Sequence, residues 1–271
     1  MEHPPSDRGF TLVEMAIVIL VIGLLLSALM LADEYTARAR LSQTVSAVQS
    51  YASATAIFLD RYSGLPGDLR DASRRIPGCL SAAACDAPSG SPGAGDGVVG
   101  LPGAITQHQT SGAAAERETV LFWSHLALTG LIGGLAPLSA PDIAWGQTHP
   151  AAPVGGGFHV KHADGGLTHP LPGWPPLADQ PSGTFVVLQR GIGDDLVPAI
   201  PGKQVLRPRD AAWIDRKLDD GGPVKGGVVA YGPAAVMGAA DACLEWPAVD
   251  LATYAERSRG QDCGLAFRIA P

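Results

Sequence analysis

The hydrophobic pattern of the chain begins with a polar stretch and becomes almost purely apolar between Phe10 and Ala32. Glu14 is the one charged residue in this run. A helix rises about 1.5 Å per residue, so the run spans about 34 Å, enough to cross a hydrocarbon core of about 30 Å. The pattern therefore predicts a membrane-spanning helix over residues 10–32.

The pattern changes after Ala32 but keeps its helical period. Apolar or small side chains recur every three or four residues on one face, at Leu41, Val45, Val48, Ala52, Thr55 and Leu59. We therefore expect one helix of about 80 Å from Phe10 to about Tyr62. Its second half, residues 33–63, is amphipathic and should pack on a globular domain.

The residues after Tyr62 are typical of a helix end. No glycine or proline interrupts the chain between Leu24 and Ser63, and Gly64 and Pro66 then follow closely. Glycine favours the left-handed conformation that closes many helices, and proline cannot continue one. We expect Gly64 to be the C-cap of the long helix.

Residues 64–271 are predicted to form a loop-rich domain with short strands. The 34 glycines and 23 prolines make about a fifth of the chain, where about 12 % is usual. Asp210 is expected to cap a short helix. The predicted helices are 113–129 and 211–218, the predicted strands are 184–189, 227–231 and 265–269, and a long surface loop is predicted over 77–115.

Charge and cysteine content restrict the function classes. The net charge is −7 and no basic stripe runs along the sequence, so nucleic-acid binding has no support. Four cysteines follow the apolar run and allow three pairings. We favour Cys79–Cys85 and Cys243–Cys263, because each closes a short local loop. Such bridges would indicate an oxidising compartment.

Glu14 is an anomaly that demands a partner or a purpose. A carboxylate inside a membrane helix costs about 2.5–3.5 kcal/mol on insertion scales. A secretory signal carries its cleavage site after the apolar core, whereas the only processing-like site here, Gly9-Phe10, lies before it. Cleavage after Gly9 would create an ammonium on Phe10, one helical turn from Glu14, that could pair within the chain or with Glu14 of a neighbour.

This segment resembles the signal of type IV pilins and type II secretion pseudopilins, matching it at Gly9, Phe10, Thr11, Leu12 and Glu14. The resemblance implies that a prepilin peptidase cleaves after Gly9 and methylates Phe10, and that Glu14 guides docking between subunits. It places the leader, residues 1–9, in the cytoplasm and residues 64–271 in the periplasm, with an anchor in the bacterial inner membrane. It also implies an α+β lollipop fold, with the long helix packed on a loop-rich globular domain that contains a small antiparallel sheet.

Two further stretches, 61–68 and 212–223, resemble elements of the same pilin-like group. The proline that many pilins carry midway through the membrane helix is absent, and so is the calcium-loop signature of major pseudopilins. The size and long loops then favour a minor or accessory subunit. The resemblance leaves open whether a type IV pilus or a type II secretion pseudopilus is served.

No enzyme motif is present, neither a G-x-S-x-G, nor a P-loop, nor an H-E-x-x-H. Residues 95–100 fit G-x-G-x-x-G but lack the flanking strand and helix of a dinucleotide site. We therefore expect a structural subunit rather than an enzyme. The alternative is a membrane-anchored periplasmic enzyme or binding protein that keeps its leader. An adhesion or DNA-uptake pilin is a further alternative, and the acidic balance disfavours DNA.

Metal binding is a weaker hypothesis. Asp215, Asp219 and Asp220 are candidate calcium ligands, and Asp96 and Asp86 are weaker ones. The alternative that we favour places Asp215 on a solvated face and uses Asp219 and Asp220 to cap a turn, because a calcium cage needs 6–8 oxygens. A histidine cluster, His159, His162 and His169, is disfavoured because its first two members lie three apart on a strand-like run.

Overall fold

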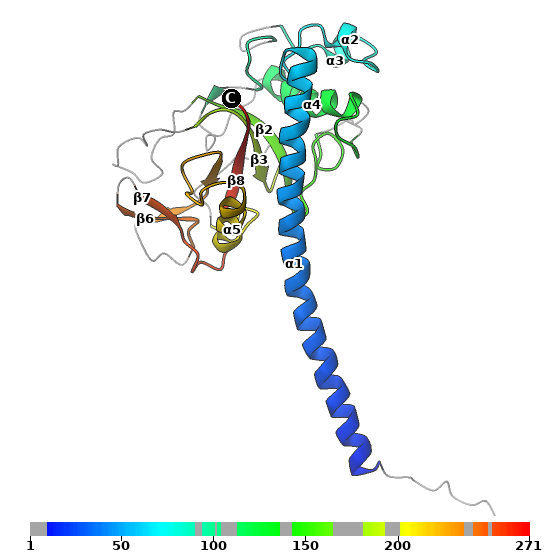
Figure 1. Ribbon diagram of the computed structural model, residues 1–271, viewed down its shortest axis with the longest axis vertical. Helices are drawn as coiled ribbons and strands as arrows, with labels where there is room; N and C mark the ends of the chain where they lie inside the picture. The colour runs from blue at the N-terminus through cyan, green and yellow to red at the C-terminus, as the bar shows by residue number, and fades with distance from the viewer. Residues whose placement is uncertain are drawn as a thin grey trace, which may run out of the picture.

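The computed structural model describes residues 10–89, 94–100, 102–103, 113–135, 143–164, 181–192, 201–235, 241–248 and 251–271. A single helix, α1 (Leu12–Tyr62), runs the length of the molecule, and a globular domain packs against its C-terminal half (Figure 1). The long helix predicted from the hydrophobic pattern is therefore one element. The predicted leader, including Gly9, lies outside the described residues.

The C-terminal end of α1 differs from the prediction by one residue. Ser63, not Gly64, is the C-cap; it adopts a left-handed conformation with φ 51°, and its N–H donates to the Leu59 carbonyl at 2.8 Å. Gly64 serves packing instead, because a Cβ there would lie 2.6 Å from Cδ2 of Leu69. A side chain at this position would have to displace the end of the Leu69 side chain, and the left-handed conformation falls on the residue before the glycine.

Five strands form the main sheet in the order β1-β2-β3-β8-β4. They are β1 (Pro102–Gly103), β2 (Gly157–Asp164), β3 (Ser182–Gln189), β8 (Gly264–Ala270) and β4 (Val228–Tyr231). All neighbouring pairs are antiparallel except β1 and β2. A second sheet contains β5 (Ala234–Ala235), β6 (Leu244–Ala248) and β7 (Leu251–Tyr254). A largely antiparallel sheet packed on a long helix confirms the predicted pilin-like α+β class.

The three predicted strands correspond to β3, β4 and β8, whereas the β6–β7 pair was not predicted. The remaining helices are α2 (Ala72–Arg75), α3 (Ala82–Cys85), α4 (Ala113–Leu128) and α5 (Pro208–Leu218). The prediction that Asp210 caps α5 was wrong. Arg207 is the N-cap, and Pro208 occupies the first turn, where its missing N–H costs no hydrogen bond.

The core joins α1, α4 and the main sheet. Tyr51 of α1 lies edge-on to Trp123 of α4, with ring centroids 5.0 Å apart, and to Phe158 of β2 at 5.3 Å. Aromatic pairs favour such edge-to-face geometry. The expected surface loop over 77–115 is partly internal, because Cys85 and Val99 are fully buried in this core.

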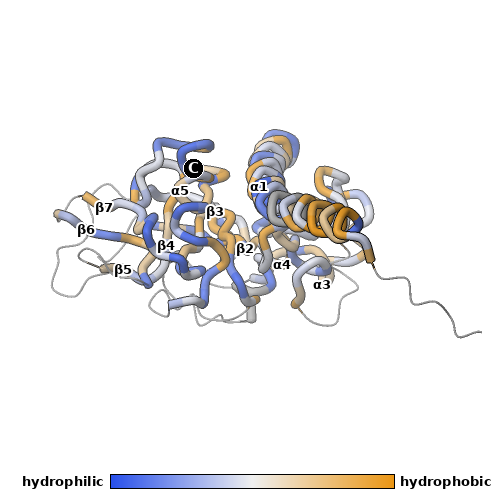
Figure 2. Tube along the Cα trace, turned by 90° about the horizontal axis from the view of Figure 1, so that it is seen from below, coloured by the Kyte–Doolittle hydropathy of each residue, from blue (hydrophilic) through white to orange (hydrophobic). Residues whose placement is uncertain are grey.

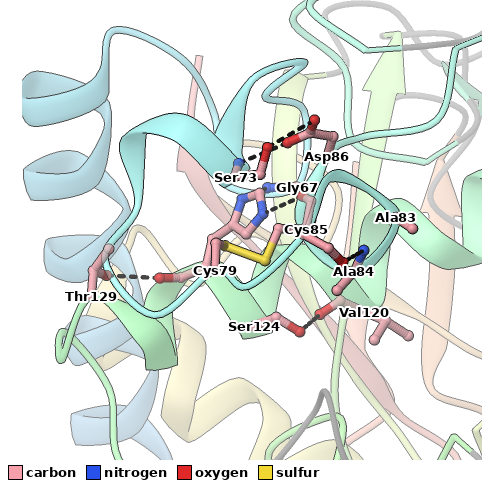
Figure 3. Close-up of a disulfide and its surroundings, with 12 residues drawn as sticks. Gly67, Ser73, Cys79, Ala83, Ala84, Cys85, Asp86, Val120, Ser124 and Thr129 are labelled. Carbon is pink, nitrogen blue, oxygen red and sulfur yellow. Dashed lines mark hydrogen bonds between the residues drawn. A yellow bond between two sulfur atoms is a disulfide. The ribbon is translucent and has the colours of Figure 1, made fainter.

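Both disulfides join cysteines that are close in sequence. Cys79 bonds to Cys85, with Cα atoms 5.9 Å apart, and Cys243 bonds to Cys263, with Cα atoms 4.9 Å apart. These are the two local pairings that the sequence favoured. Figure 3 shows the first disulfide between α3 and α4, beside the backbone of Gly67.

Candidate functional site

The membrane-length half of α1 stands free of the domain. Its large apolar side chains are exposed all round, with Leu12 86 % and Leu24 64 % exposed. Viewed along the molecule, this half is the strongly hydrophobic band of the helix (Figure 2). By length and composition α1 is able to cross a membrane. An apolar surface of this size on one helix requires lipid or other helices as its surroundings.

Glu14 stabilises the N-terminus of α1, where this apolar surface begins. Its backbone N–H donates to Thr11 Oγ1 at 3.2 Å, and its carboxylate accepts from the Thr11 backbone N–H and hydroxyl, each at 3.2 Å. This reciprocal pair is a capping box, which satisfies N–H groups that a helix start leaves unpaired. Phe10, directly before it, is 77 % exposed. The lone carboxylate therefore has a partner within its own chain.

Comparison with known proteins gives this segment its identity. Residues 5–30 match the model of the prokaryotic N-terminal methylation motif. The chain carries a prepilin-type N-terminal signal. This signal is found on type IV pilins and pseudopilins, and the apolar helix leading into a sheet domain fits it. No match was found among curated proteins or solved structures.

Behind the prepilin-type signal, the domain contains a second group of carboxylates that the sequence analysis missed. Asp68 accepts hydrogen bonds from the backbone N–H groups of Gly95 and Gly97, the second at 2.9 Å. Glu118 accepts from the N–H of Gly100 at 2.9 Å. Carboxylates from the chain thus occupy the anion-binding side of the glycine loop, which explains why its G-x-G-x-x-G pattern is not a dinucleotide site.

Burial changes the protonation of this group. Glu118 is 1 % exposed, and burial raises its pKa to about 7. Burial also raises the pKa of Asp68, although its bonds to Gly97 and Gly95 oppose the shift. The available signal in the sequence was Asp68 itself, at the end of the Leu65-Pro66-Gly67-Asp68 element. The resemblance of residues 61–68 to the pilin-like group assigns no chemical role to Asp68.

His125 is a structural residue. Its Nδ1 accepts from the Gly67 N–H at 3.0 Å, so Nε2 carries the proton and donates to the Cys85 carbonyl at 2.9 Å. Burial lowers its pKa to about 4, which keeps the ring neutral. The histidine therefore ties the first disulfide to the turn that follows α1, and both of its ring nitrogens are used.

The three candidate calcium ligands do come together. Ligand oxygens of Asp215, Asp219 and Asp220 lie within 4.8 Å of one another. Asp215 is fully buried rather than solvated, so that part of the favoured alternative was wrong. Its carboxylate accepts from the Tyr254 hydroxyl at 2.7 Å and the Gly221 N–H at 3.3 Å, and burial raises its pKa to about 6.

The other two carboxylates cap the loop after α5, as the favoured alternative held. Asp219 accepts from the N–H groups of Gly227 and Val228, the latter at 3.2 Å. Asp220 accepts from the Gly222 N–H at 2.7 Å. The cluster could offer three oxygens to a cation, fewer than the 6–8 that calcium takes. The carboxylate oxygens of this cluster already accept hydrogen bonds from backbone N–H groups and from the Tyr254 hydroxyl.

The weaker metal candidates are separated. Asp86 accepts from both the N–H and the hydroxyl of Ser73, at 2.7 and 3.1 Å, and Figure 3 shows this pair above the disulfide. Asp96 accepts from the Val98 N–H at 2.9 Å. His159 and His162 both lie on β2, three residues apart as expected, and His169 lies outside the described residues. Among the described residues, the only three-ligand cluster is that of Asp215.

Proposed function

We propose that the protein is a minor or accessory subunit of a type IV pilus or a type II secretion pseudopilus. A prepilin peptidase cleaves it after Gly9 and methylates the new N-terminal Phe10. Before assembly α1 anchors it in the bacterial inner membrane, with the leader in the cytoplasm and the domain in the periplasm. The proposal makes it a structural protein whose partners are the peptidase and other pilin-like subunits.

The observation that carries the proposal is the combination of a methylation motif with a fully exposed apolar helix. A domain with its own core gains nothing from a free apolar helix of this length in water, because exposed apolar surface costs about 25 cal/mol per Å². Packing against the same helix of neighbouring subunits buries that surface while the domains stay outside.

Cleavage would then change the group to which the Glu14 carboxylate binds. In the single chain its carboxylate binds Thr11. After cleavage the Phe10 ammonium offers a stronger, charge-assisted partner, either in the same chain or in the next subunit. In an apolar bundle a carboxylate that loses both partners is strongly disfavoured, so the pair fixes the register between adjacent helices.

The test is intact-mass spectrometry of the membrane-purified protein, with and without a co-expressed prepilin peptidase. We expect loss of residues 1–9 and a gain of one methyl group only with the peptidase. Glu14→Ala should still be cleaved but should fail to join filaments, whereas Glu34→Ala, which removes an exposed acid of the same helix, should assemble. A full-length chain beside active peptidase would refute the proposal and favour an anchored enzyme or binding protein.

We infer that this role needs no cofactor. The Asp215, Asp219 and Asp220 carboxylates accept hydrogen bonds from the protein itself, so the loop they cap does not depend on a cation. Calcium is a hard cation whose chemistry fits carboxylate oxygens of this kind.

A further inference from the structure

An arginine-lined groove lies between α1 and α5. Arg38 and Arg40 enter it from α1, and Arg207 and Arg209 enter it from the start of α5. Its volume is about 710 Å³. In Figure 1, α5 lies at the end of the domain nearest to the apolar half of α1. We call this feature the arginine groove.

The arginine groove carries positive charge that the chain leaves unneutralised. Arg38 pairs with Glu34 at 2.7 Å, and Arg209 lies 3.9 Å from Asp210. The exposed side chains of Arg40 and Arg207 have no ion pair or hydrogen bond within the part of the chain that the structure describes. This local excess stands in a protein of net charge −7, so it is opposite in sign to the rest of the surface.

The floor and rim of the arginine groove are apolar. Leu41, Val205 and Leu206 line it and are buried. Trp213 of α5 stands at its edge and is 39 % exposed. A tryptophan beside cationic side chains is typical of the boundary between hydrocarbon and water, where one end of the ring is apolar and the other is wet.

The position of the arginine groove along α1 matches the headgroup layer of a membrane. Arg38 and Arg40 follow Ala32, the end of the apolar run, by about 9–12 Å along the helix. Headgroups extend about 5–8 Å beyond each face of the hydrocarbon core. Arginine side chains are long and can extend their charged ends toward the membrane interface. They can therefore cover the distance that remains between the helix backbone and the headgroups.

We propose that the arginine groove binds the phosphate of an anionic phospholipid in the leaflet that faces the domain. Guanidinium groups recognise phosphate oxygens through paired N–H donors, and Arg40 and Arg207 are free to do so from opposite walls. The bound lipid holds the domain against the membrane before assembly. The proposal rests on insertion of α1 into a membrane, but not on cleavage or filament formation.

A second groove, of about 690 Å³, is lined by arginines that have partners within the chain. It lies at the far end of α1, and its Arg75 donates to the Tyr62 carbonyl and pairs with Asp71, while Arg70 donates to the Ala94 carbonyl. These arginines serve the fold. Arg40 and Arg207 instead lie beside the apolar half of α1 (Figure 1), and this position favours a lipid over a soluble anion or an acidic protein partner.

The test is native mass spectrometry of the full chain in detergent, with phosphatidylglycerol or phosphatidylcholine added at equal concentration. We expect selective retention of phosphatidylglycerol. Replacing both free arginines (Arg40→Gln with Arg207→Gln) should weaken it roughly tenfold, since each basic side chain near an anionic surface adds several-fold in affinity. The matched control, Arg61→Gln with Arg74→Gln, removes one charge from α1 and one from the domain at the far end and should leave it unchanged.

Several results would overturn the proposal. Equal retention of both lipids, or equal losses in the two double variants, would mean nonspecific attraction. Displacement by millimolar inorganic phosphate would identify a soluble anion as the ligand. Unchanged lipid binding, with loss of binding to a second subunit, would make the groove a protein contact. The intact mass in the same spectra reports leader cleavage separately, so failure here is distinct from failure of the proposed function.

Discussion

The two halves of α1 are both rich in apolar residues but lie in opposite surroundings. In the first half Leu20 and Leu24 are 63 % and 64 % exposed. In the second half Val48 and Phe58 are 5 % and 0 % exposed. Apolar side chains cover the whole circumference of the first half, whereas they form a single face in the second. One continuous helix therefore has two different surroundings. The second half packs on the domain, and the first half presents an apolar surface that is long enough to cross a membrane.

The second half of α1 contributes to folding, whereas the exposed first half is available for association. The second half is part of the core, with Tyr51 in contact with α4 and β2. The first half contributes no buried side chain among those described. Mutations in the second half should act on stability, and mutations in the first half should act on the membrane and on partners.

The largest effect should come from emptying the buried face. Phe58→Ala should lower the free energy of unfolding by about 3–5 kcal/mol, because it removes a fully buried ring and leaves a cavity. Ile57→Ala, one residue earlier and 53 % exposed, should cost less than about 1 kcal/mol. Denaturant unfolding of the full chain in mild detergent measures both. Equal losses would mean that the two faces of this half do not differ.

The converse experiment places a charge in the exposed half. Leu20→Lys should cost about 2.5–3.5 kcal/mol for insertion at the membrane centre while leaving the unfolding of the domain unchanged. Gln43→Lys puts the same charge on the exposed face of the second half and should alter neither. Alkaline extraction of membranes reports insertion. Retention of Leu20→Lys as complete as that of the unmodified chain would contradict the assignment of this half to the bilayer.

Much of the architecture followed from the sequence because its signals were local. The membrane-length apolar run, the period of α1, the short apolar runs of β3, β4 and β8, and the close cysteine pairs each depend on neighbouring residues. The prepilin-type signal is likewise a short continuous motif. Local patterns erred by small amounts at element ends, as at Ser63 and Asp210, where packing and a proline determined the boundary.

The features that the sequence did not reveal are assembled from distant positions. Glu118 meets Gly100 across a loop, and Asp215 meets Tyr254 across the domain. The arginine groove joins Arg40 to Arg207, although no basic stripe exists along the chain. The strong burial of Asp215 was missed because its sequence neighbours are charged and suggest a solvated face.

The domain half should also respond to pH through Glu118. Burial raises its folded pKa from 4.5 to about 7, so the folded state binds more protons than the unfolded state between these values. The Glu118 contribution to stability therefore falls as pH rises from about 4.5 to about 7, by at most a few kcal/mol, since one pKa unit equals about 1.4 kcal/mol.

Glu118→Gln isolates this effect, because glutamine keeps an oxygen for the Gly100 N–H but does not ionise. Relative to the unmodified chain, the variant should gain stability as pH rises through that window. The difference between the two chains is the useful measure, because His125, whose pKa is lowered to about 4, gives an opposite slope in both. Parallel curves of unfolding free energy against pH would contradict the assignment. Insertion of α1 should be unaffected.

The smallest effect concerns whether the stability of the domain depends on a bound cation. If Asp219 and Asp220 serve only as caps, neither calcium at about 1 mM nor excess chelator should move the melting temperature by more than about 1 °C. Asp220→Asn keeps an acceptor for the Gly222 N–H and should cost less than about 0.5 kcal/mol. A calcium-dependent rise of several degrees that Asp219→Asn abolishes would instead establish a cation site. In the expected case the two halves of α1 differ fully: the apolar half depends on lipid or on another subunit, and the half within the domain needs neither partner nor ion.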